Sequence, residues 1–271
     1  MKLAYPVGTP EARGKMLAYQ GEFADICSTL KSIGYSGVEL FVRSPQEMDV
    51  SRVSRAIEKQ NLEVAAIGTG PLVGEDKLTF TALDESRRRA AIDRTKVVID
   101  FAALFGTQVI IGKLRGDLQA GNVEISKKWM KEAFLEVGAY AHTRNVKITI
   151  EPQSRLAVNN LNTAEQAVEW INELKLPNLY VMLDSYHMNI EETSMAAGIL
   201  AAKGHNIHMH LADDNRGIPG TGQIDFHDLV RRLRAIQYRY YLSLEINQFP
   251  DSFKAAQASF EYLYPIITEK R

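Results

Sequence analysis

Three acidic residues and one histidine each stand at the end of a short apolar run. They are Glu151, Asp184, His210 and Glu245, spaced 33, 26 and 35 residues apart. A carboxylate that loses water beside apolar strands is stable there only if a cation meets it. Three carboxylates that meet would also repel one another unless a divalent ion neutralises them. Three oxygen ligands with one imidazole are typical of Mn²⁺, Co²⁺ or Mg²⁺, and are also compatible with catalytic Zn²⁺.

Two further histidines lie near this set. His187 follows Asp184 by three residues, and we expect it to be a further ligand, a hydrogen-bond donor to a substrate, or part of the rim. His208 precedes His210 by two residues, so both side chains point to the same side of a strand. We assign His210 to the metal because it is nearer the strand end, and expect His208 in the core or behind the ligand. Glu39 is compatible with a supporting partner but is not assigned to the site.

These residues need a scaffold that brings four strand ends together. Apolar or β-branched runs alternate with longer amphipathic segments, and several runs are apolar at nearly every position, as in parallel strands covered on both faces. Ser51 and Thr163 are expected helix N-caps. The expected strands are 3–6, 37–41, 62–67, 108–111, 146–150, 179–183, 207–211 and 241–246. The expected helices include 22–33, 51–59, 84–104, 124–141, 164–174 and 226–236.

Eight strand-then-helix units would each take about 34 residues, the size of a parallel βαβ element. No linker rich in Pro, Gly or Ser divides the chain. We therefore expect residues 1–271 to form a single (β/α)8 TIM barrel, of class α/β. An open doubly wound sheet is the rival fold, but it commonly carries a Gly-rich turn after the first strand, and residues 7–10 read Val-Gly-Thr-Pro. In a barrel the active site lies at the carboxyl ends of the strands, which would bring the four residues to one mouth.

The composition argues against several classes of protein. Lys and Arg number 32 against 33 Asp and Glu, for a net charge of −1, so the basic excess typical of nucleic-acid or anionic-membrane binding is missing. No uninterrupted apolar stretch approaches about 18 residues. Pro6 interrupts the N-terminus before any run that a signal peptide would need. One cysteine, Cys27, excludes a disulfide framework and a four-cysteine zinc site. We expect a cytoplasmic protein that binds a small molecule.

Several stretches of the chain carry a resemblance to a known family: Glu151-Pro152, Asp184 to His187, His210 to Arg216, Leu244 to Ile246, Gly37 to Leu40 and Gly220 to Phe226. In this order and spacing they resemble the xylose isomerase-like barrel superfamily. Within it, the chain looks most similar to the sugar (phosphate) isomerases and epimerases, especially the D-tagatose/D-psicose 3-epimerase group. The resemblance covers nearly the whole chain.

The resemblance implies a ketose 3-epimerase or isomerase that removes a proton beside a carbonyl through a metal-stabilised cis-enediolate. It implies that Glu151 and Glu245 act as the acid/base pair on opposite faces of the sugar. It also implies that His187 and Arg216 hold the substrate's oxygen atoms. The divalent ion, most often Mn²⁺, would be held by Glu151, Asp184, His210 and Glu245. Related enzymes are usually oligomers, so a homodimer or homotetramer is expected by analogy.

One departure from that pattern concerns the loop after the first metal glutamate. Many free-ketohexose epimerases carry Asn-Arg in this loop and a second glutamate six residues after the first. Here Arg155 is retained, but Ser154 stands at the Asn position and Ala157 at the glutamate position. The departure argues against a free ketohexose while leaving the metal chemistry untouched.

Cations near two strand ends favour an anionic substrate. Lys113 and Arg115 follow the fourth strand, and Arg155 follows the fifth. Cations on adjacent loops can bind a phosphate or carboxylate, although solvated rim charges are the plainer interpretation. The expected substrate is therefore a sugar or a sugar phosphate, with Lys113, Arg115 and Arg155 as candidate binding residues.

Three other functions are weighed against an epimerase. A metal-dependent lyase of the keto-inositol dehydratase type also begins by removing a proton beside a ketone, but then expels a hydroxyl. An apurinic-site endonuclease of the same superfamily needs histidines from early strands, and this chain has none before His142. A non-catalytic sugar-binding protein gives no reason for two glutamates at the mouth.

Overall fold

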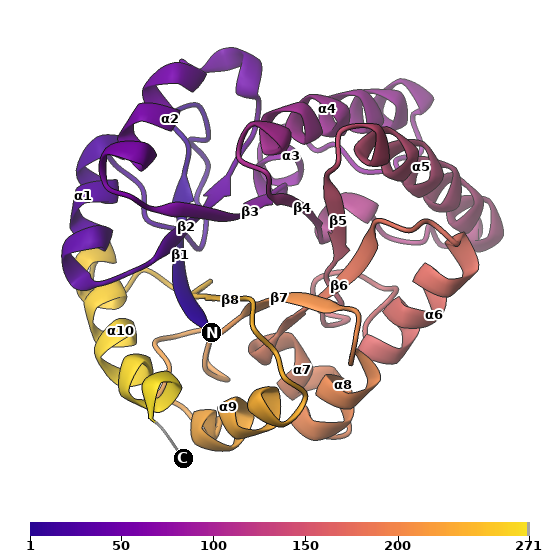
Figure 1. Ribbon diagram of the computed structural model, residues 1–271. Helices are drawn as coiled ribbons and strands as arrows, with labels where there is room; N and C mark the ends of the chain where they lie inside the picture. Colours follow the sequence, from indigo (N-terminus) through magenta and orange to yellow (C-terminus); the bar gives the residue numbers. More distant parts are fainter. Residues whose placement is uncertain (270–271) are drawn as a thin grey trace.

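The computed structural model describes residues 1–269 of the chain. Its eight strands are all parallel and close into a barrel in sequence order, with β8 paired to β1 (Figure 1). The predicted (β/α)8 TIM barrel is therefore confirmed. The strands are β1 (Lys2–Gly8), β2 (Gly37–Phe41), β3 (Glu63–Gly68), β4 (Gln108–Ile111), β5 (Lys147–Ile150), β6 (Leu179–Asp184), β7 (Asn206–His210) and β8 (Tyr241–Ser243).

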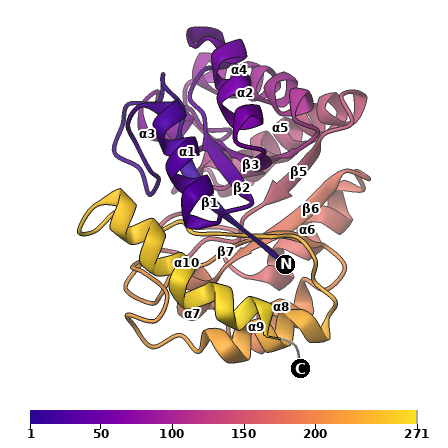
Figure 2. The same cartoon turned by 60° about the vertical axis from the view of Figure 1, so that its left-hand side comes forward.

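Helices surround the barrel, and α10 packs against both α1 and α9 to close the ring (Figure 2). Within the described residues, no helix is long and apolar enough to cross a membrane. The α-helices are α1 (Phe23–Ile33), α2 (Val50–Lys59), α3 (Gly70–Gly74), α4 (Glu85–Leu104), α5 (Val123–Thr143), α6 (Ala164–Leu174), α7 (Ser185–Glu191), α8 (Met195–Ala201), α9 (Phe226–Ala235) and α10 (Ser252–Thr268). Two 3₁₀ helices are η1 (Pro45–Glu47) and η2 (Lys113–Arg115).

The apolar residues divide between the outside and the inside of the barrel. The main core lies between the strands and the helices, where the large buried side chains gather. A small separate cluster consists of Ala66, Ile110 and Met182. Ile110 also lines the cavity at the mouth, so this cluster fills the barrel interior below the site. Glu39 and His208 are fully buried as well, which makes part of the barrel filling polar.

The N-terminal cap of α2 differs from the sequence prediction. The expected cap, Ser51, lies exposed inside the helix, whereas Asp49 caps it by accepting a hydrogen bond from the Arg52 backbone N–H at 3.0 Å. Asp49 is extended in φ and ψ, so its carboxylate can turn back to the first helical turn. The predicted cap of α6 is confirmed, because Thr163 forms a reciprocal capping box with Gln166.

We expect Asp49→Ala to lower the free energy of unfolding by about 1 kcal/mol, because an N–H of the first turn loses its partner. The matched change Ser51→Ala removes no cap and should shift the free energy by less than about 0.5 kcal/mol. Urea unfolding followed by circular dichroism measures both. Equal effects of the two changes would show that Asp49 is not the cap that matters.

Candidate active site and metal centre

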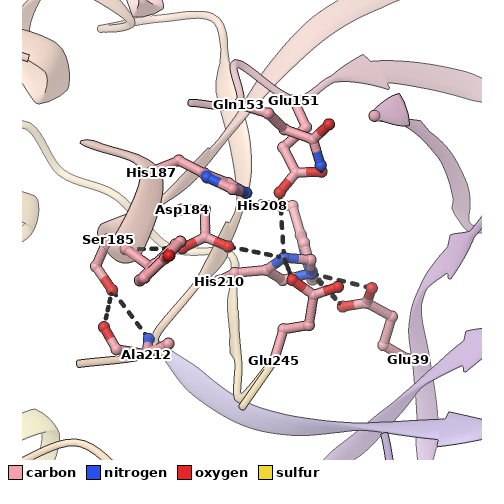
Figure 3. A network of polar contacts seen from close by, with 12 residues as sticks. Glu39, Glu151, Gln153, Asp184, Ser185, His187, His208, His210, Ala212 and Glu245 are labelled. Carbon is pink, nitrogen blue, oxygen red and sulfur yellow. Dashed lines mark hydrogen bonds and ion pairs between the residues drawn. The ribbon is translucent and has the colours of Figure 1, made fainter. Parts of the chain in front are cut away.

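The four residues predicted to bind a metal converge at the carboxyl ends of four neighbouring strands. Asp184 and His210 are the last residues of β6 and β7, Glu151 directly follows β5, and Glu245 lies two residues beyond β8. One ligand atom from each lies within 4.8 Å of those from all the others. Figure 3 shows the side chains pointing toward one another. Because their strands are consecutive, the four form an arc with Glu151 and Glu245 at its two ends.

His210 lies at the centre of this arc. Its Nδ1 is 3.6 Å from Glu151 Oε1, 3.6 Å from Asp184 Oδ2 and 3.3 Å from Glu245 Oε2. Burial alone would lower the pKa of His210, but the charges of Glu39 and Glu245 outweigh it and raise that pKa well above its usual value. The His210 imidazolium therefore supplies positive charge at the centre of the arc.

Glu39 on β2 holds the far side of His210. Both carboxylate oxygens of Glu39 accept from His210 Nε2 at 3.0 Å, and Oε2 also accepts from His208 Nε2 at 2.9 Å. Burial would raise the pKa of Glu39, yet the charge of His210 and the two histidine hydrogen bonds lower it below its ordinary range. An ionised Glu39 can only accept, so Nε2 of His210 carries a proton and Nδ1 is the atom offered to the arc.

The donor set fits a divalent metal ion. Glu151 Oε1 and His210 Nδ1 are buried and have no hydrogen-bond partner among the described residues. Buried polar atoms without a partner are rare, because they lose hydration and gain nothing in return. An ion between them would satisfy both atoms and neutralise the neighbouring carboxylates. Carboxylate oxygens with one imidazole suit Mn²⁺, Mg²⁺, Co²⁺ or Zn²⁺.

Arg216 adds a second positive charge at the edge of the arc. Its guanidinium donates to Asp184 Oδ2 at 2.5 Å and to Glu245 Oε2, and it lies over the Tyr186 ring at 4.8 Å. Burial would raise the pKa of Asp184, but the positive charges of Arg216 and His210 lower it. The other oxygen, Oδ1, accepts from the Tyr186 N–H and caps α7, so the start of that helix fixes the carboxylate.

The loop that carries Arg216 is folded around Asp213. This buried carboxylate accepts four backbone N–H groups, from Asp214, Gly220, Gly222 and Ile224. A Cβ at Gly222 would lie 2.4 Å from Asp213 Oδ1, so only glycine fits this close approach. The Gly220 to Phe226 motif therefore builds the loop that presents Arg216.

His187 presents a hydrogen-bond donor to the cavity. Its Nδ1 accepts from the Ser154 backbone N–H at 3.2 Å, which places the ring proton on Nε2. Nε2 has no partner among residues 1–269, and His187 lines the cavity. His187 can therefore donate to a substrate oxygen, as the resemblance implies.

Gln153 orients Glu151. Its Nε2 donates to Glu151 Oε2 at 2.8 Å, which leaves Oε1 facing the arc. A Cβ at Gly112 would lie 2.6 Å from Glu151 Oε2 and 2.9 Å from Gln153 Nε2. Gly112 is thus the wall against which this carboxylate and amide are packed.

The structure places the three cations predicted to bind an anion in different surroundings. Lys113 is exposed and lines a cavity of about 780 Å³ at the mouth of the barrel, together with Glu151, His210 and Glu245. Arg115 does not fit the prediction. It is fully buried, and its five N–H groups are taken by the side chain of Asn160 and the backbone oxygens of Gly112, Glu151, Asn160 and Leu161.

Burial lowers the pKa of Arg115 to about 10, against the opposing charges of Glu151 and Asp117. The side chain ties together the loops after β4 and β5 and has no donor left for a substrate. Arg155 is exposed and forms an ion pair with Glu191 at 2.7 Å. It does not line the cavity, so the structure brings only Lys113 of the three toward the site.

Sequence comparison identifies the family. The family model described as the xylose isomerase-like TIM barrel matches residues 27–266. The chain belongs to the xylose isomerase-like TIM barrel family. The predicted resemblance is therefore confirmed.

The relatives of this barrel include several sugar epimerases by name. An L-ribulose 3-epimerase from Methylomonas sp. is 29% identical over 222 residues, which cover 78% of this chain and 74% of that protein. A 3-dehydro-D-guloside 4-epimerase from Escherichia coli is 25% identical over 224 residues, covering 80% and 84%. The crystal structure of a D-allulose 3-epimerase from Methylomonas sp. with D-allulose has a TM-score of 0.80 and 22% identity, covering 97% of this chain and 96% of that one. Epimerases are isomerases, so the predicted enzyme class agrees with these relatives.

Glu39 and Gln153 are the site residues that sequence reasoning did not assign. Glu39 sits within a strand that is buried at every position, and an acid at such a position must meet a positive or hydrogen-bonding partner. That signal was present in the sequence. Gln153 lies in an irregular loop two residues after Glu151, where no periodic pattern says which way a side chain points.

Proposed function

We propose that this protein is a divalent-metal-dependent sugar epimerase that inverts a carbon beside a ketose carbonyl, with Glu151 and Glu245 as the acid/base pair. The observation that carries the proposal is the arc of ligands, in which these two carboxylates occupy opposite ends. A sugar bound across the arc would have one carboxylate on each face. The names of the relatives support the same reaction class.

The metal would be held by Glu151, Asp184, His210 and Glu245, and when bound it would stabilise the negative charge that develops on the substrate oxygens as the proton leaves. Either glutamate can take a proton from the carbon on its own face, while the other returns one to the opposite face. Arg216 keeps Glu245 oriented, and Gln153 does the same for Glu151. His187 Nε2 donates to a substrate oxygen and so fixes the position of the sugar.

Single substitutions of the two glutamates should separate the two half-reactions. With Mn²⁺ in deuterated water, we expect Glu151→Gln and Glu245→Gln each to slow epimerisation about 10²–10⁴-fold. Each variant should still exchange hydrogen for deuterium in one epimer only, the one whose proton faces the remaining carboxylate. NMR of the recovered sugars measures both quantities, and Glu173→Gln on α6 is the surface control.

Both variants must be shown to retain Mn²⁺, which the amide oxygen can still ligate. If either metal-loaded variant epimerises at the wild-type rate, that glutamate is not part of the acid/base pair. Deuterium at C3 of a ketose would indicate 3-epimerisation, and deuterium at C1 or C2 would indicate isomerisation. An unsaturated product with rising ultraviolet absorbance would indicate a dehydratase.

Removing the charge of Glu39 should weaken metal binding although Glu39 is not a ligand. Glu39→Gln keeps the side-chain shape but loses the anion that accepts from His210 Nε2, so Nδ1 becomes a poorer ligand. We expect Mn²⁺ affinity, measured by calorimetry, to fall about 10–100-fold. Glu63→Gln on β3 is the control, since its carboxylate lies exposed and pairs with Lys2. An unchanged affinity in Glu39→Gln would show that Glu39 does not tune the ligand.

A further inference from the structure

The cavity at the mouth has two chemically different halves. The carboxylates and histidines of the metal centre come from β5 to β8. Loops that follow β1, β3 and β4 complete the lining and contribute Lys15, Lys77 and Lys113 to it. A molecule that fills the cavity therefore meets both the metal centre and the loops that carry these lysines.

The loops that carry the three lysines are joined to one another. The Phe80 backbone N–H donates to Leu114 O at 2.9 Å, which ties the segment after α3 to η2 beside Lys113. The Arg13 backbone N–H donates to Glu75 Oε1 at 3.1 Å, which ties the loop of Lys15 to the end of α3. The lysines thus stand on one connected wall and not on independent loops.

This wall carries excess positive charge. Glu75 is the single carboxylate among the described lining residues outside the metal centre and Glu39. Its Oε1 accepts a hydrogen bond from the Arg13 backbone N–H, and its Oε2 lies 4.0 Å from Arg43 Nε. Lys15 and Lys113 have no hydrogen-bond or ion-pair partner within residues 1–269, and Lys77 donates to Gly74 O at 2.6 Å. Elsewhere, cations such as Arg155 and Lys131 pair with glutamates.

We propose that the substrate carries an anionic group, a phosphate monoester or a carboxylate, at the end away from its reacting carbonyl, and that Lys15, Lys77 and Lys113 bind this group. The inference rests on the proposed function, since it takes the reacting end to lie at the glutamates. Ammonium groups bind such anions through charge-assisted hydrogen bonds. All three lysines are exposed, so added salt should weaken this attraction.

The kinetic test compares an anionic ketose with its neutral parent. For the metal-loaded wild type, kcat/KM should be higher for a ketose phosphate or a keto-acid sugar than for the neutral ketose. The ratio of the two kcat/KM values should fall about tenfold in Lys113→Gln, the loss of one charge-assisted contact. It should fall further when Lys15→Gln and Lys77→Gln are added. Lys128→Gln on α5, an exposed lysine outside the cavity, should leave the ratio unchanged.

A wild type that prefers the neutral ketose to every anionic one, or a triple variant with an unchanged ratio, would overturn the proposal. Comparing phosphate with carboxylate substrates identifies which anion is bound. A total lack of turnover on all sugars would count against the proposed function instead.

Binding of inorganic phosphate tests the lysines without turnover. Calorimetry on metal-loaded protein should show phosphate binding that is weaker by about tenfold in Lys113→Gln and unchanged in Lys128→Gln. Because every variant holds the same metal, a difference between them reports the lysine wall alone. Equal affinities in all variants would overturn the anion site even if the enzyme proves to be an epimerase.

Discussion

The repulsion between three carboxylates at one point is the constraint on which this site depends. Glu151, Asp184 and Glu245 could not all stay ionised so close together in a largely buried site unless positive charge lay between and beside them. In the structure His210 lies between them and Arg216 at their edge. These charges raise the pKa of His210 and lower the pKa of Asp184. A divalent ion would concentrate that charge where the ligand atoms converge. Glu39, Gln153 and the capped start of α7 serve to keep those atoms pointed at the same place.

Hydrogen bonds within the barrel stabilise these buried charges. Arg115 donates hydrogen bonds to backbone oxygens of the loops after β4 and β5. Asp213 accepts hydrogen bonds from four backbone N–H groups in the loop that carries Arg216. Ser185 Oγ donates to Ala212 O at 2.7 Å and accepts from the Ala212 N–H at 2.9 Å, which links the ends of β6 and β7. Buried charges of this kind stabilise a fold only when every donor and acceptor is matched. Here their main effect is to hold the positions of the metal-site side chains.

Much of this arrangement could be predicted from the sequence, because parallel strands leave a strong apolar signal. The strands 37–41 and 108–111 and the helix 164–174 have the predicted bounds. The convergence of Glu151, Asp184, His210 and Glu245 followed from their places at strand ends, since a barrel brings all such ends to one mouth. β8 is shorter than predicted and ends at Ser243, although the Leu244 N–H still donates to Ala4 O of β1 at 3.2 Å.

The rest depended on contacts that no local pattern encodes. Arg115 was assigned to substrate, yet its partners lie up to 46 residues away in a loop of irregular backbone. Glu39 and His210 are 171 residues apart, and only barrel closure brings them together. The short helices α7 and α8 and the C-terminal α10 were not predicted, and the cytoplasmic location and oligomeric state stay predictions.

The account's central claim is that four side chains converge on one divalent ion. Anomalous diffraction from crystals grown with Mn²⁺ tests it most directly. We predict a single strong peak per chain within bonding distance of Glu151, Asp184, His210 and Glu245, with His210 bound through Nδ1. A pocket without a peak at saturating Mn²⁺, or a peak that these four residues do not surround, would contradict the account.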